Sequence, residues 1–123
     1  MKIYSAYFND PDLKAAMVKE MKWHREQDKI IQGTNREGTN GDFRGCSVGC
    51  AIHSLMRLRK EKLNTSDHSL LEKYLNIPEH LWHLNDAIHE GLPIEKAKDW
   101  PVQFLEVIPV GADGQGYGGT AAS

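Results

Sequence analysis

The chain lacks a long apolar run. No segment of its 123 residues approaches the roughly 18 consecutive apolar residues that a membrane-spanning helix needs. Its first eight residues are too few and too polar for a signal peptide. We therefore expect a cytoplasmic protein that does not contact a membrane.

Cysteine is scarce, since the chain has only Cys46 and Cys50. In a reducing compartment these two residues are expected as thiols, thiolates or metal ligands rather than as a disulfide. A bridge between residues four apart in one helix would also be strained. The pair therefore indicates ligand chemistry, reactivity or plain packing.

Neither sign of charge dominates, because 15 Lys and Arg face 17 Asp and Glu, for a net charge of −2. This balance argues against a broad grip on nucleic acid or anionic lipid, so nucleic acid is not an expected partner. The glycine-rich fingerprints of phosphate-binding loops are absent. The one basic cluster, residues 57–62, could meet phosphate together with Arg36 and Arg44, but a solvated helix end is the preferred interpretation.

The pattern that is present is helical. A chain of this length forms one domain, and apolar spacing with capping residues predicts an all-α fold. We expect a compact bundle of about five helices, over about 11–32, 46–62, 68–75 and 78–91 and in short pieces up to 108. Residues 1–8 are expected to be a short extended segment. A single helical domain would cover residues 1–110, and the glycine-rich residues 111–123 would form a flexible tail.

The predicted helix over 46–62 has two distinct faces. The apolar face, expected in the core, consists of Val48, Ile52 and Leu55. The opposite face carries both cysteines with a histidine and an arginine: Cys46, Cys50, His53 and Arg57. Cysteines that served only as small core residues would be expected on the apolar face.

The helix over 78–91 is expected to bury a stripe made of Leu81, Leu84 and Ile88. Its histidines, His80, His83 and His89, are expected to be solvated.

One hypothesis for the cysteine face is a catalytic thiol. Cys46 stands at a helix N-terminus, where unpaired backbone N–H groups stabilise a thiolate. His24 is the candidate base, with Asp28 or Glu20 orienting its ring. The predicted catalytic set is therefore Cys46, His24 and Asp28.

A second hypothesis is a metal site. Cys46, Cys50 and His53 share one helix face, and His24 would complete four ligands. Zinc is a possible occupant, although the spacing is not that of a zinc finger.

Three segments resemble one family: residues 8–11 with 24–28, the Arg-Gly-Cys-Ser-Val-Gly-Cys run at 44–50, and residues 90–113. They are similar to a group of small uncharacterised proteins from bacteria and their phages. That group has no assigned activity, so the resemblance implies no catalytic role. A phage or mobile-element origin would imply an accessory protein that inhibits a host factor.

The first functional prediction is therefore a small cytoplasmic binding protein whose partner is a host protein. An exposed cluster of Trp82, Trp100 or Tyr117 would favour it, since aromatic residues dominate binding hot spots. The alternative is a thiol enzyme or metal-binding protein that uses Cys46, Cys50, His53, His24 and Asp28. Whether the protein is an enzyme is left open at this point.

Overall fold

The computed structural model describes residues 4–34, 36–38 and 42–113. These residues form a 3-10 turn and six α-helices, five of them seven residues or longer, with two isolated β-bridges and no strand. The elements are η1 (Ala6–Asn9), α1 (Pro11–Glu26), α2 (Ser47–Arg59), α3 (Ser69–Leu75), α4 (Glu79–Gly91), α5 (Ile94–Ala97) and α6 (Trp100–Val107). The predicted all-α bundle of about five helices is confirmed. Within the described ranges, every helix is too short or too polar to cross a bilayer.

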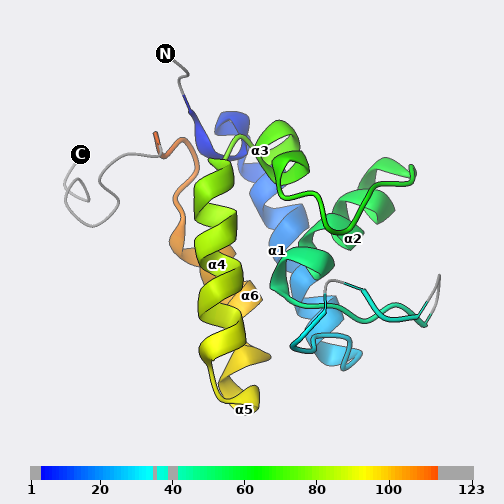
Figure 1. The fold of residues 1–123 in the computed structure, drawn as a ribbon. Coiled ribbons are helices and arrows are strands. Elements are labelled where there is room, and N and C mark those ends of the chain that lie inside the picture. Colours follow the sequence, from blue (N-terminus) through cyan, green and yellow to red (C-terminus); the bar gives the residue numbers. More distant parts are fainter. Residues whose placement is uncertain (1–3, 35, 39–41, 114–123) are drawn as a thin grey trace.

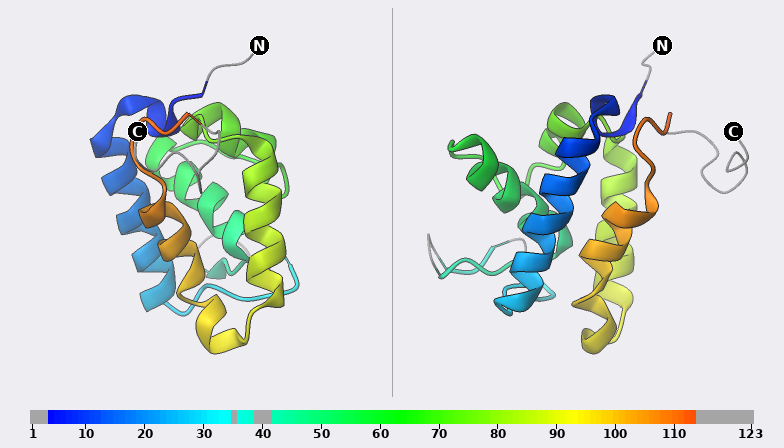
Figure 2. Two further views of the ribbon diagram at one scale, coloured as in Figure 1. Left: turned by 90° about the vertical axis from the view of Figure 1, so that its left-hand side faces the viewer. Right: turned by 180° about the vertical axis from the view of Figure 1, so that it is seen from behind.

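Helix α2 begins inside the bundle, and its second half projects to one side (Figures 1 and 2). It packs against α1, α3, α4 and α6, while α6 also contacts α1 and α4. Because neighbours surround it, its first two turns, residues 47–52, are buried all round. The apolar face predicted for this helix is confirmed, since Val48, Ile52 and Leu55 are all buried.

The two cysteines do not lie on a polar face as expected. Cys46 and Cys50 are buried with exposed fractions of 2% and 0%. The expectation was wrong because it assumed that α2 has a solvent side along its whole length. Only the second half of the helix has one, where Arg57 is exposed and His53 is half-buried.

Helix α1 begins as predicted and ends early. Asp10 caps it by accepting a hydrogen bond from the backbone N–H of Asp12 at 2.9 Å, and Pro11 occupies the first helical position. The helix stops at Glu26 rather than near residue 32. Asp28 then turns the chain with a φ of 54°, and Ile30 enters the core beside Gly45 through a parallel β-bridge.

Helix α4 is rotated relative to its predicted orientation. Leu84 and Ile88 are exposed, and the buried residues are Trp82, Asn85 and His89. The polar pair is buried because it is hydrogen-bonded. The side-chain oxygen of Asn85 accepts from Ser47 Oγ at 3.0 Å and from Trp100 Nε1 at 2.6 Å, and His89 Nε2 donates to the carbonyl of Ile31 at 2.9 Å.

The two ends of the packed chain lie side by side. The backbone N–H of Ala6 donates to Ala112 at 2.8 Å, and that of Gly111 donates to Ala6 at 2.9 Å. Gly111 has a φ of 85°, and a Cβ there would clash with the side chain of Asn9, so any other residue would be strained at this position. The packed region thus extends beyond the predicted boundary at 110. The rest of the predicted flexible tail, residues 114–123, lies outside the described residues.

The predicted extended segment over 1–8 takes a different form where it is described. Tyr7 and Phe8 have positive φ values of 57° and 53° within η1. This unusual turn is held because the hydroxyl of Tyr7, itself fully buried, donates to the carbonyl of Leu105 at 2.8 Å.

Candidate functional site

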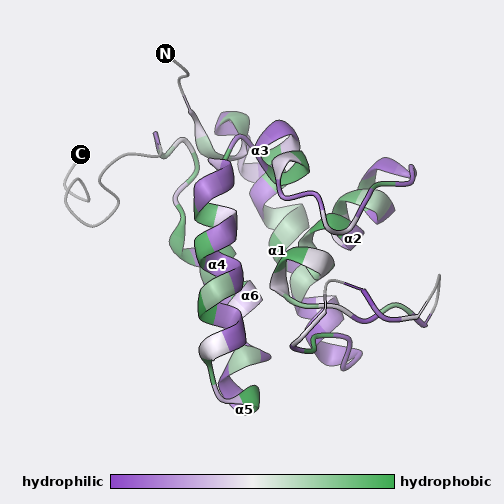
Figure 3. Ribbon diagram, viewed as in Figure 1, coloured by the Kyte–Doolittle hydropathy of each residue, from purple (hydrophilic) through white to green (hydrophobic). Residues whose placement is uncertain are grey.

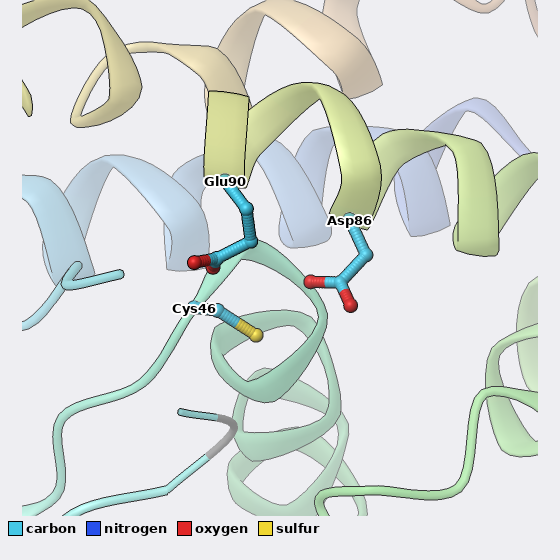
Figure 4. Close-up of side chains that lie close together, drawn as sticks. All are labelled: Cys46, Asp86 and Glu90. Carbon is cyan, nitrogen blue, oxygen red and sulfur yellow. The ribbon is translucent and has the colours of Figure 1, made fainter. Parts of the chain in front are cut away.

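Cys46 occupies the position just before the first turn of α2. Its sulfur accepts a hydrogen bond from the backbone N–H of Gly49 at 3.5 Å, so the thiol caps the helix. The predicted helix start is therefore confirmed to within one residue. The side chain is buried against α4 (Figure 4).

Two carboxylates of α4 face this sulfur. Asp86 and Glu90 are four residues apart, which places them on one side of the helix. Figure 4 shows both side chains pointing toward Cys46 across the space between α4 and the start of α2. One ligand atom from each of the three residues lies within 4.8 Å of the other two. We call Cys46, Asp86 and Glu90 the thiol–carboxylate cluster.

His68 adjoins this cluster through Asp86. Its Nε2 lies 3.7 Å from Asp86 Oδ2, and its Nδ1 donates to the carbonyl of Ser66 at 3.2 Å. In a neutral ring Nε2 then carries a lone pair, so two electron-rich atoms face each other. Buried Asp86 Oδ1 and His68 Nε2 also have no hydrogen-bond partner among the described residues. The arrangement therefore places two acceptor atoms that lack donors beside the thiol–carboxylate cluster.

The environment of Cys46 does not favour a free thiolate. The pKa of the Cys46 thiol is raised from 9.0 to about 12, mainly by burial, with smaller contributions from the charge of Asp86 and from a hydrogen bond to Asp86. The hydrogen bond from Gly49 opposes this shift but is weaker than the desolvation. The helix N-terminus therefore does not produce the reactive thiolate expected from the sequence, because the sulfur is cut off from water.

His24 and His53 form a pair of hydrogen-bonded rings. His24 is fully buried, and its Nε2 lies 2.7 Å from Nδ1 of His53. His24 Nδ1 contacts the backbone carbonyl of Glu20 at 2.9 Å, and a carbonyl only accepts. His24 must therefore carry its hydrogen on Nδ1, and His53 donates from its own Nδ1 to His24 Nε2.

Both rings of this pair are neutral near pH 7. The pKa of His24 is lowered from 6.5 to about 4, mainly by burial. The hydrogen bond to the Glu20 carbonyl opposes this shift, and the charges of Arg57 and Lys29 add to it. The pKa of His53 is likewise lowered from 6.5 to about 4, mainly by burial and to a smaller extent by the charges of Arg57, Lys29 and Arg36. His53 Nε2 thus presents a lone pair, which accepts hydrogen bonds.

The predicted catalytic set, Cys46, His24 and Asp28, is not brought together. Both ring nitrogens of His24 are used by Glu20 and His53, which leaves neither to take a proton from Cys46. Asp28 lies on the surface, where its Oδ1 accepts from Lys98 at 2.9 Å. That hydrogen bond and the charge of Lys98 lower the pKa of Asp28. The backbone of Glu20, rather than an acidic side chain, orients the His24 ring.

The four predicted metal ligands, Cys46, Cys50, His53 and His24, are also not brought together. In the part of the chain that the structure describes, the thiol–carboxylate cluster is the one set of three or more such side chains that converges within 4.8 Å. Cys50 instead donates to the carbonyl of Gly45 at 3.3 Å. Burial raises the pKa of Cys50 well above its usual value. Cys50 therefore serves as a packed core residue.

Sequence reasoning missed Asp86, Glu90 and His68. A signal for the first two was present, because carboxylates four residues apart share a helix face. The apolar spacing of Leu81, Leu84 and Ile88 instead predicted that a different face of the helix is buried. Nothing in the sequence indicates that this acidic face meets Cys46, which lies 40 residues earlier.

Comparisons of this chain with protein-family models, with curated proteins and with solved structures give no match.

Proposed function

We propose that this protein binds a divalent transition-metal ion, with zinc as the first candidate, through the thiol–carboxylate cluster. The observation that carries the proposal is the convergence of Cys46, Asp86 and Glu90 within 4.8 Å. Ligand atoms of a tetrahedral zinc ion lie roughly 3.3–3.8 Å apart, since zinc bonds are about 2.0–2.3 Å long. Small side-chain adjustments would therefore close the cluster around an ion.

The donor set is suited to such an ion. A sulfur ligand disfavours Mg²⁺ and Ca²⁺, which bind oxygen, and favours zinc and related metals. Three protein ligands leave a fourth position for water, as in catalytic rather than structural zinc sites. His68 would lie outside the ion, with its Nε2 3.7 Å from Asp86 Oδ2. The proposal replaces Cys50, His53 and His24 of the sequence prediction with Asp86 and Glu90.

Cobalt substitution tests this proposal directly. Reduced protein titrated with Co²⁺ is expected to show one equivalent bound and a sulfur-to-cobalt charge-transfer absorption, because Cys46 is a ligand. Zinc should displace the cobalt and remove the absorption. Cys46→Ser should abolish it.

Cys50→Ser is the matched control, because a serine hydroxyl still donates to the carbonyl of Gly45. It should keep the absorption. If Cys50→Ser loses the band while Cys46→Ser keeps it, the ligand assignment is wrong. If neither metal binds the wild-type protein in reducing buffer, the function itself is refuted.

We propose as a second candidate function that this is a small cytoplasmic, phage-derived protein that inhibits a host factor. The observation in its favour is a groove of about 810 Å³ along α1, with apolar walls that include Ala15, Val18 and Val110. The proposed binding hot spot is this groove and not the expected aromatic cluster of Trp82, Trp100 or Tyr117. Trp82 is buried, Trp100 is partly buried and bonded to Asn85, and Tyr117 lies outside the described residues. Val18→Glu should abolish copurification of a host protein, whereas Leu84→Glu on α4 should not.

A further inference from the structure

A cavity of about 320 Å³ lies beside the second half of α2. It is bounded by the end of this helix, by residues 61–65 and by Arg36 and Phe43. Four of the side chains lining it are cationic: Arg36, Arg57, Lys60 and Lys62. Figure 3 shows hydrophilic residues, in purple, among hydrophobic ones, in green, along the end of α2. None of the residues of the thiol–carboxylate cluster lines the cavity.

The two arginines of this cavity are held in place. Arg57 donates from Nε to Glu20 at 2.8 Å, and its guanidinium lies over the Trp23 ring at 3.8 Å. Arg36 donates from Nε to the carbonyl of Gly38 at 3.1 Å. Because Nε is the anchoring atom in both cases, the outer N–H groups remain directed away from these contacts. Fixed guanidinium forks of this kind suit the oxygens of phosphate or carboxylate.

The negative charge of Glu61, which lines the cavity, is largely balanced by Arg59. Glu61 accepts from Arg59 Nε at 2.8 Å, and Arg59 is not among the lining residues. The C-terminus of α2 adds the equivalent of about half a negative charge, which would repel an anion. Four cationic side chains outweigh that contribution, so the cavity favours a negatively charged ligand.

His53 adds a hydrogen-bond acceptor to this cationic wall. Its ring stacks on Phe43 with the centroids 4.0 Å apart, which fixes the ring plane. Its Nδ1 is used by His24, and its Nε2 forms no hydrogen bond with the described residues. A ligand that satisfies the whole cavity must therefore be anionic and also carry a hydroxyl hydrogen.

We propose that this cavity binds a phosphate group, either as inorganic phosphate or as a small phosphate monoester. Phosphate oxygens accept from the arginines and from Lys62. The P–OH that inorganic phosphate keeps at neutral pH donates to His53 Nε2, and a monoester carries this hydrogen only as its monoanion, because its second pKa is about 6. The cavity is at the small end of the range for ligand pockets, which selects a small phosphorylated molecule. Sulfate offers the same oxygens without a hydrogen at neutral pH, so it satisfies only the cations.

Calorimetric titration of the full chain with inorganic phosphate tests the proposal. Low ionic strength limits screening, and a chelator prevents phosphate from acting through metal at Cys46. Saturable binding is expected, and Arg36→Gln and Lys62→Gln should each weaken it by about fivefold or more, because each removes a charge-assisted contact. Lys96→Gln is the matched control, since it removes one positive charge from α5 outside the cavity.

Failure of phosphate to bind saturably would overturn the proposal, and so would equal losses in Lys62→Gln and Lys96→Gln. A parallel titration with glycerol phosphate identifies the source of the group. Tighter binding than inorganic phosphate assigns the site to a monoester, and weaker binding assigns it to the free ion.

His53→Phe tests the acceptor. It keeps a ring on Phe43 and removes Nε2, so the preference of the wild-type protein for phosphate over sulfate should disappear. A preference that persists in a folded His53→Phe variant would overturn the assigned role of His53. If this variant does not fold, the same comparison of phosphate with sulfate in the wild-type protein decides, because equal affinities would contradict a P–OH bond to His53.

Discussion

The two ends of α2 differ in the charge of the side chains around them. At its start, Asp86 and Glu90 surround Cys46, whereas its second half carries Arg57 and Lys60 beside His53. The helix dipole stabilises both sets, because it favours negative groups at the N-terminus and positive groups at the C-terminus. Under the two proposals, each set would bind a ligand of the opposite sign: a metal cation at the start of α2 and a phosphate anion beside its second half.

The largest effect is expected at the start of α2. Asp86→Asn removes a charged donor from the thiol–carboxylate cluster and should weaken zinc binding by about a hundredfold or more, since even supporting residues contribute about 10–100-fold. Competition with a chromophoric chelator measures this change. Phosphate affinity should not fall in the same variant, and a parallel loss of both would show that the two ends are not independent.

A smaller effect, a loss of stability at lower pH, is expected from the His24–His53 pair. Their pKa values are lowered from 6.5 to about 4, so the unfolded chain binds more protons between these pH values. Stability is therefore fully present above pH 6.5 and falls as the pH drops toward 4. The shift at His24 alone should lower the free energy of unfolding by about 2 kcal/mol between pH 7 and pH 5, since one pKa unit is about 1.4 kcal/mol.

Urea unfolding at the two pH values measures this loss. His80→Gln is the control, because His80 is exposed and should leave the pH dependence unchanged. Equal stability of the wild-type protein at pH 7 and pH 5 would contradict the neutral, buried pair.

A pH dependence of zinc affinity is expected at the start of α2. Cys46 must lose its proton to bind a metal, and its pKa is about 12. Zinc affinity should therefore rise about tenfold per pH unit near neutrality, because one proton is released. Measurements between pH 6.5 and pH 8 should give this slope, and an affinity independent of pH would exclude Cys46 as a ligand.

The smallest effect is expected from Glu61→Gln. Removing this exposed carboxylate from the cavity wall should strengthen phosphate binding by about two- to threefold, in line with the small effects of surface charges. Glu95→Gln on α5 makes the same change of charge outside the cavity and should leave the affinity unchanged. An equal gain in both variants would indicate general electrostatics rather than a local contact.

The parts of the fold that depend on local signals were predictable. Asp10 with Pro11 marks the start of α1, and Pro78 immediately precedes α4. The early end of α1 could not be predicted, because it depends on the pairing of Ile30 with Gly45, a partner 15 residues away. Capping preferences act within a few residues and carry no information on such pairings.

The candidate sites were predictable only in part. Cys46, His24 and His53 were singled out from the sequence, yet each has partners that were not expected. The rotation of α4 explains the failure at Cys46, because apolar periodicity favoured Leu84 and Ile88 over the face that carries Asp86. Asn85 and His89 are buried by virtue of specific hydrogen bonds, which a hydrophobic pattern does not represent.

The pairing of Ala6 with Ala112 has a practical consequence for engineering the chain. Because these residues are hydrogen-bonded neighbours, a short peptide could join the two ends of the packed region without disturbing the helices. New termini could then open in the exposed residues 60–62, beside the cavity. A circularly permuted chain of this kind would keep every helix intact. Its stability, compared with that of the original chain, would show how much the connection at residues 60–62 contributes to the stability of the bundle.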